Sequence, residues 1–106
     1  MSEHILNQVF EVLKTRKGAD PEGSYVASLY AKGTQHICDK VIEEADEVIV
    51  EALKGDADLL KAESADLLFH LMVLWADQGI APADVFNILE KRFGTSGHDE
   101  KASRSS

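Results

Sequence analysis

The sequence of 106 residues contains few of the features that mark secreted, membrane-spanning or nucleic-acid-binding proteins. Its single cysteine, Cys38, cannot form an intramolecular disulfide. No apolar run approaches the roughly 20 residues that a transmembrane helix needs, and no secretory signal pattern follows Met1. The net charge of −8 argues against a basic surface that would bind phosphate backbones nonspecifically. We therefore expect a cytoplasmic protein that binds neither membranes nor nucleic acid.

Several common catalytic motifs are also missing. The sequence has no P-loop or dinucleotide fingerprint, no clustered cysteine and histidine for zinc, and no ExxH pair of the kind used in di-iron bundles. An anionic small-molecule substrate remains compatible with the acidic composition, because bound divalent cations would reverse the local field. These absences leave metal-dependent chemistry on oxygen ligands as the leading class.

Apolar residues recur at helical spacing along most of the chain, and no useful length alternates with a period of two. The pattern predicts an all-α fold, an antiparallel helical bundle built on a long helical hairpin that turns at Gly55. Caps and stop signals place the helices at residues 3–14, from Ser24 to Gly33, at 34–54, at 57–79 and from Pro82 onward. We interpret residues 1–93 as one domain and residues 94–106 as a flexible tail.

The segment from Leu67 to Ala76 carries apolar side chains in nearly every helical direction. A helix of this kind is usually buried on all sides. The remaining helices are too few to surround it, so the pattern predicts at least a homodimer.

Two pairs of acids share a three-residue spacing and lie equally far from Gly55: Glu44 with Glu47, and Glu63 with Asp66. In an antiparallel hairpin Glu47 comes level with Glu63, and Glu44 comes level with Asp66. Two like charges about 4 Å apart repel by roughly 4 kcal/mol at an effective dielectric of about 20. The spacing therefore predicts a cation, most plausibly Mg²⁺, with Mn²⁺ as a substitute.

Two local alternatives stay open. The first acidic run could be a solvated face in which Lys40 pairs with Glu43, Glu44 and Glu47. His70, one turn beyond Asp66, could hydrogen-bond to that acid as an orienting partner, or could be a partly buried histidine satisfied by backbone or solvent.

The motifs carry a family resemblance. The strings KVIEEADE (40–47) and ESAD (63–66) resemble the EExxE and ExxD signature of the all-α, MazG-like nucleotide pyrophosphohydrolases. The flanking strings SYVASLYAKG (24–33), HLMVLWADQGI (70–80) and GTSGHDEKASR (94–104) resemble the phosphoribosyl-ATP pyrophosphatase family of histidine biosynthesis. Ile42 stands where that pattern has a glycine.

The resemblance implies hydrolysis of phosphoribosyl-ATP to phosphoribosyl-AMP and pyrophosphate. It implies Mg²⁺ at Glu44, Glu47, Glu63 and Asp66, and we predict Glu43 or Glu47 as the base that accepts the proton of the attacking water. The predicted contacts to substrate phosphates are basic side chains: Lys32, Lys40, Arg92, Lys101 and Arg104. Two other functions remain open, a pyrophosphohydrolase of canonical or damaged dNTPs and a non-catalytic helical dimerisation module.

Overall fold

The computed structural model describes residues 4–94, and these residues form five helices with no strand among them. The predicted all-α class is confirmed. In chain order the helices are α1 (Ile5–Thr15), α2 (Tyr25–Lys32), α3 (Thr34–Lys54), α4 (Ala57–Asp77) and α5 (Pro82–Phe93). In the described part of the chain, no helix combines the length and the apolar character that a membrane span requires.

Polar caps fix the starts of three helices at the predicted positions. The Ser24 hydroxyl accepts from the Ala27 N–H at 3.2 Å, and the Asp56 carboxylate accepts from the Leu59 N–H at 3.0 Å. The Asp84 carboxylate reaches back to the Ala81 N–H at 2.8 Å. Each bond satisfies a backbone donor that a helix start leaves without an intrahelical partner. Local sequence therefore sets these boundaries.

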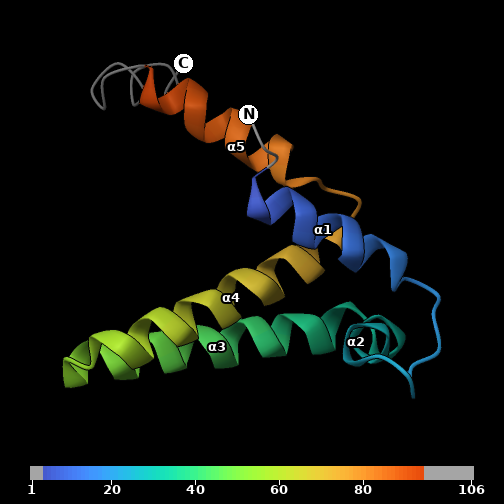
Figure 1. Ribbon diagram of the computed structural model, residues 1–106, viewed down its shortest axis with the longest axis horizontal. Helices are drawn as coiled ribbons and strands as arrows, with labels where there is room; N and C mark the ends of the chain where they lie inside the picture. The colour runs from blue at the N-terminus through green and yellow to red at the C-terminus, as the bar shows by residue number, and fades with distance from the viewer. Residues whose placement is uncertain (1–3, 95–106) are drawn as a thin grey trace.

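Helices α3 and α4 form the predicted hairpin (Figure 1). Gly55 closes α3 in the left-handed region, at a φ of 77°, which costs a glycine little. At the opposite end, the Thr34 hydroxyl donates to the Asp77 carboxylate at 2.6 Å. Helix α4 ends at Asp77 rather than at residue 79, because Gly79 adopts the left-handed region at a φ of 73° and the Ile80 N–H bonds back to the Trp75 carbonyl at 2.8 Å.

The hydrophobic core occupies only the end of the hairpin that α1 and α2 cover (Figure 1). Four helices contribute its buried residues: Phe10, Leu13, Leu29, Ile37, Met72, Val73 and Ala76. Cys38, next to Ile37, is a partly buried free thiol. Helix α5 packs on α1 and diverges from the hairpin.

The apolar faces of the hairpin continue beyond this core toward Gly55. Ile49 is 55% exposed and Leu53 is 84% exposed on α3, and Leu68 is 42% exposed on α4. The predicted burial of α4 on all sides is therefore incomplete in the single chain. The acidic residues lie on this part of the hairpin, outside the core.

Candidate metal and catalytic site

Three carboxylates from the two long helices converge near the middle of the hairpin. Glu44 belongs to α3, Glu63 and Asp66 belong to α4, and one oxygen of each lies within 4.8 Å of the others. Positions equally far from Gly55 come level in an antiparallel hairpin, which is why the matched spacing anticipated this approach. The structure brings together three of the four predicted metal ligands.

Glu47, the fourth predicted ligand, contacts the other acids from the next turn of α3. Its interactions raise the pKa of both Glu44 and Glu63. Interaction with Glu47 is the largest cause that raises the pKa of Glu63 from 4.5 to about 7, and burial and the carboxylates of Asp66 and Glu44 contribute to the same rise. Glu63 therefore holds a proton well above the ordinary range of a glutamate.

Glu44 is the most deeply buried acid of the cluster, with 9% of its surface exposed. Burial is the main cause that raises its pKa, followed by the hydrogen bond with Glu47. The nearby His70 acts in the opposite direction and lowers the pKa of Glu44. Solvent can therefore stabilise a negative charge on Glu44 only poorly, whereas Glu47 and Asp66 are exposed.

Two buried oxygens of the cluster, Glu44 Oε2 and Glu63 Oε2, accept no hydrogen bond from the described residues. Glu51, one turn beyond Glu47, has a third such atom, Oε1. Unpartnered buried carboxylate oxygens are unfavourable unless a cation or a proton compensates them. The donors are all carboxylate oxygens, which suit a hard divalent cation such as Mg²⁺ better than zinc. The residues present therefore fit a divalent metal ion.

Glu43 and Lys40 lie beside this cluster. The Lys40 ammonium donates to the Glu43 carboxylate at 3.2 Å, and this bond is the main cause that raises the pKa of Lys40. Glu43 does not belong to the group of converging oxygens, and its side chain is 54% exposed. Of the two predicted base candidates, Glu47 lies inside the cluster and Glu43 lies at its edge. The solvated-face alternative is correct for the Lys40–Glu43 pair alone.

Comparisons with known proteins identify the family of the chain. The family model described as Phosphoribosyl-ATP pyrophosphohydrolase matches residues 6–93. A phosphoribosyl-ATP pyrophosphatase of Geobacter sulfurreducens is 56% identical over 102 residues, which are 96% of this chain and 94% of that protein. The enzyme of the same name from Azospirillum brasilense is 51% identical over all of this chain and 96% of its own length. The chain belongs to the phosphoribosyl-ATP pyrophosphohydrolase family.

Membership of the phosphoribosyl-ATP pyrophosphohydrolase family confirms the resemblance drawn from the acidic motifs and their flanks, and it makes the chain a hydrolase. A further relative, from Zymomonas mobilis, is 50% identical over 98% of this chain and 97% of its own length. These matches extend over nearly the whole chain and not over the acidic motifs alone.

The predicted phosphate contacts of this pyrophosphohydrolase do not all lie at the acids. Lys40 lies at the edge of the cluster, and Lys32 is exposed at the end of α2. Arg92 lies near the end of α5, the helix that diverges from the hairpin (Figure 1). Lys101 and Arg104 fall outside the described residues. Of the three basic residues that the structure describes, it brings Lys40 to the acids.

The contacts of His70 decide between its two predicted roles. They also involve Tyr25, which the sequence did not indicate as a residue of the site. Its Nδ1 lies 2.8 Å from the backbone oxygen of Asp66, so it contacts the main chain of that residue and not the carboxylate. Its Nε2 lies 2.9 Å from the hydroxyl of Tyr25 on α2. Tyr25 is 45 residues away in the chain, and no local pattern could signal this contact.

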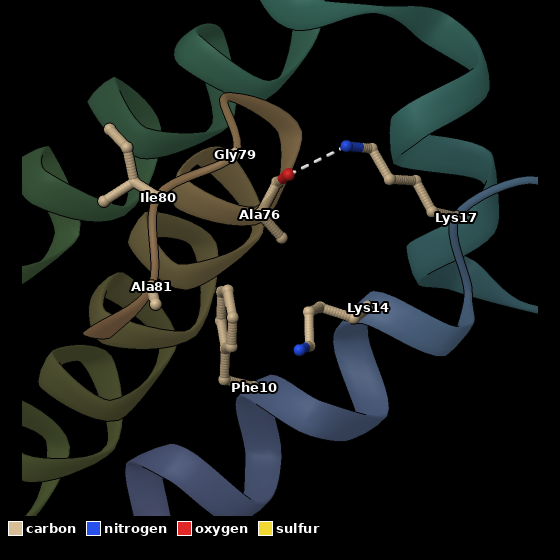
Figure 2. A pocket seen from close by; sticks show the side chains of 7 residues that line it. All are labelled: Phe10, Lys14, Lys17, Ala76, Gly79, Ile80 and Ala81. Atoms are coloured by element: carbon tan, nitrogen blue, oxygen red, sulfur yellow. Dashed lines mark hydrogen bonds between the residues drawn. The ribbon is translucent and has the colours of Figure 1, made fainter. Parts of the chain in front are cut away.

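A separate pocket of about 410 Å³ lies between α1 and the end of α4 (Figure 2). Phe10, Lys14, Lys17, Ala76 and residues 79–81 line it. The Lys17 ammonium donates to the Ala76 carbonyl at 2.9 Å and so ties α1 to the last turn of α4. Ala76 lies ten residues beyond Asp66, roughly 15 Å along the helix axis, so this pocket is distinct from the acidic site.

Proposed function

We propose that the protein hydrolyses phosphoribosyl-ATP to phosphoribosyl-AMP and pyrophosphate in histidine biosynthesis. The convergence of Glu44, Glu63 and Asp66 across the hairpin, with Glu47 beside them, is the observation that carries the proposal. The matching family and the relatives named phosphoribosyl-ATP pyrophosphatase support this substrate over dNTPs. A purely structural helical module would not need buried carboxylates without partners.

The four acids are the proposed ligands of Mg²⁺, with Mn²⁺ as a functional substitute. The two unpartnered buried oxygens and the raised pKa values of Glu44 and Glu63 support this assignment. When bound, the ion supplies positive charge that offsets the triphosphate and makes the attacked phosphorus more electrophilic. The chain's own part is to hold the acids in register from two antiparallel helices.

Glu43 and Glu47 remain the candidates for the base that accepts the proton of the attacking water. Glu47 is within the cluster, whereas Glu43 is exposed at its edge and is held by Lys40. Lys40 is also the basic side chain best placed to contact substrate phosphate next to the acids. Lys32 and Arg92 would complete the phosphate contacts only if a second chain approached the site. Lys101 and Arg104, outside the described residues, remain proposed contacts.

The protein is further proposed to act as a homodimer. Six large apolar side chains of the two long helices remain exposed away from the core: Ile42, Ile49, Val50, Leu53, Leu59 and Leu68. Exposed apolar surface of this extent is uncommon on monomeric proteins. A second copy would complete the cover that the single chain lacks on α4.

The test is pyrophosphate release from phosphoribosyl-ATP, measured with Mg²⁺ and after chelation. Activity should require the metal, and Asp66→Asn should reduce kcat by about 100-fold or more while the protein stays folded. Asp58→Asn is a matched control, because Asp58 is a 95% exposed acid on the same helix. A dNTP panel run alongside should give much lower kcat/KM values.

Two further variants separate the proposed roles. If Glu43 is the base, Glu43→Gln lowers kcat by roughly 100- to 10,000-fold and leaves Mn²⁺ affinity intact in calorimetry. Glu47→Gln should weaken Mn²⁺ binding whichever acid is the base. Undiminished turnover in both Asp66→Asn and Glu47→Gln would refute the site.

A further inference from the structure

Tyr25 and His70 connect α2 to the acidic site through a pair of defined contacts. The Tyr25 hydroxyl lies 2.9 Å from His70 Nε2, and His70 Nδ1 lies 2.8 Å from the Asp66 carbonyl. The Tyr25 and His70 rings meet edge to face, with centroids 6.0 Å apart. His70 is buried, with 6% of its surface exposed, so its orientation is set by these contacts.

The contact with the Asp66 carbonyl shows which nitrogen of the His70 ring carries a proton. A backbone carbonyl can only accept, so His70 Nδ1 carries the proton and donates to Asp66. In a neutral ring Nε2 accepts from the Tyr25 hydroxyl, and in a charged ring Nε2 donates to the hydroxyl oxygen. In both states His70 holds the Tyr25 hydroxyl. What Tyr25 offers to a ligand is its ring.

The ring is accessible and lies beside the acids. Tyr25 is 53% exposed, although its hydroxyl is anchored. Electrostatic interaction with Tyr25 contributes to the raised pKa of Lys40, the side chain paired with Glu43. Phe69, which also meets His70 edge to face, is less exposed and packs against the core. Tyr25 thus presents an aromatic surface next to the place where the triphosphate of a nucleotide would bind.

We propose that Tyr25 is a substrate-contact residue whose ring stacks on the purine of the nucleotide, and that His70 is a positioning residue that holds this ring. The inference rests on the proposed function, since it concerns the same substrate and the same site. It assigns recognition of the base to α2 and recognition of the phosphates to the hairpin. A base stacked on an aromatic ring gains binding free energy whatever its edge groups are.

Steady-state kinetics of the full chain with phosphoribosyl-ATP and Mg²⁺ test this assignment. Tyr25→Leu removes the ring and should raise KM by roughly 5- to 150-fold, with little change in kcat. Tyr25→Trp keeps an aromatic face and should retain a KM near that of the wild type. Tyr30→Phe is the matched control, because it removes a phenol hydroxyl on the same helix that bonds to the Leu13 carbonyl.

Ligands that lack a purine distinguish a loss of stacking from a general disturbance of the site. The inhibition constant of inorganic pyrophosphate and the Mn²⁺ affinity should be the same in wild type and Tyr25→Leu. His70→Leu should raise KM at least as much as Tyr25→Phe, because it also removes the bond to the Asp66 carbonyl. The double variant should show no further rise over His70→Leu, because both changes remove the same bond between Tyr25 and His70.

An unchanged KM in Tyr25→Leu would overturn the inference, as would an equal loss of substrate, pyrophosphate and Mn²⁺ binding. Failure of the proposed function gives a different result, because wild type and Tyr30→Phe would then also fail to hydrolyse phosphoribosyl-ATP.

Discussion

At the scale of single residues, the acidic site is an arrangement that the folded chain stabilises poorly by itself. The neighbouring Glu47 is the largest cause that raises the pKa of Glu63 to about 7, and the oxygens Glu44 Oε2 and Glu63 Oε2 are buried without partners among the described residues. Functional sites commonly reduce stability in this way, because the groups are arranged for a ligand and not for one another. The same groups should therefore make stability depend on pH.

The direction of this pH dependence follows from the pKa of Glu63, which is raised from 4.5 to about 7 on folding. Between these two values the folded state holds more protons than the unfolded state, so the free energy of unfolding of the metal-free protein falls as pH rises. Glu44, whose pKa is also raised, acts in the same direction.

We expect Glu63→Gln to melt at a higher temperature than the wild type at about pH 8 without metal, and to show a smaller difference near pH 5. Thermal denaturation followed by circular dichroism measures both. Added Mg²⁺ should raise the midpoint of the wild type more than that of Glu63→Gln. A wild-type advantage at the higher pH in the absence of metal would contradict this account of the site.

At the scale of elements, the hairpin turn determines which acids meet. Gly55 ends α3 at a φ of 77°, and Asp56 caps α4 immediately afterwards. The two helices have 21 residues each and run antiparallel, so residues that are equally far from Gly55 lie side by side. A shift of the turn by one residue would rotate one carboxylate pair away from the other.

Gly55→Ala should destabilise the protein by about 1–2 kcal/mol, because a Cβ is unfavourable in the left-handed region. No atom lies within 4 Å of the position of that Cβ, so the cost is one of backbone conformation and not of packing. Gly55→Asn should cost less, since asparagine tolerates this region. Urea denaturation measures the differences, with Gly23→Ala, which has no positive φ, as the control. Equal stability of the two alanine variants would show that the turn is not strained.

At the scale of the whole molecule, the single chain leaves much of the hairpin uncovered. The core lies at the end where α1 and α2 pack, and α5 follows α1 away from the hairpin (Figure 1). Ile49 and Leu53 on α3 remain more than half exposed. Burying such side chains in an interface would contribute roughly 25 cal/mol for each Å² of apolar surface removed from water.

Ile49→Glu combined with Leu53→Glu should convert the proposed dimer into a monomer, because two charges would have to be buried in the interface. Analytical ultracentrifugation gives the mass directly. Lys61→Glu, at a 79% exposed position on α4, controls for the added negative charge alone. A wild-type protein that sediments as a monomer at micromolar concentration would refute the dimer.

The sequence alone determined the features that depend on near neighbours. The cap at Ser24 was sufficient to predict the start of α2. The glycine at residue 55 and the three-residue spacing of the acids were sufficient to predict the hairpin and the approach of Glu44, Glu63 and Asp66. Helix periodicity and a turn residue are local properties, and two antiparallel helices joined by a short turn have little freedom in register.

Only the tertiary structure decided the features that join distant segments. The contact between Tyr25 and His70 spans 45 residues, and helical periodicity carries no information about it. The same holds for the boundary between buried and exposed parts of the apolar stripe. The sequence marks which side chains are apolar or charged, but the packing of α1 and α2 on one end of the hairpin determines which of them lose contact with water.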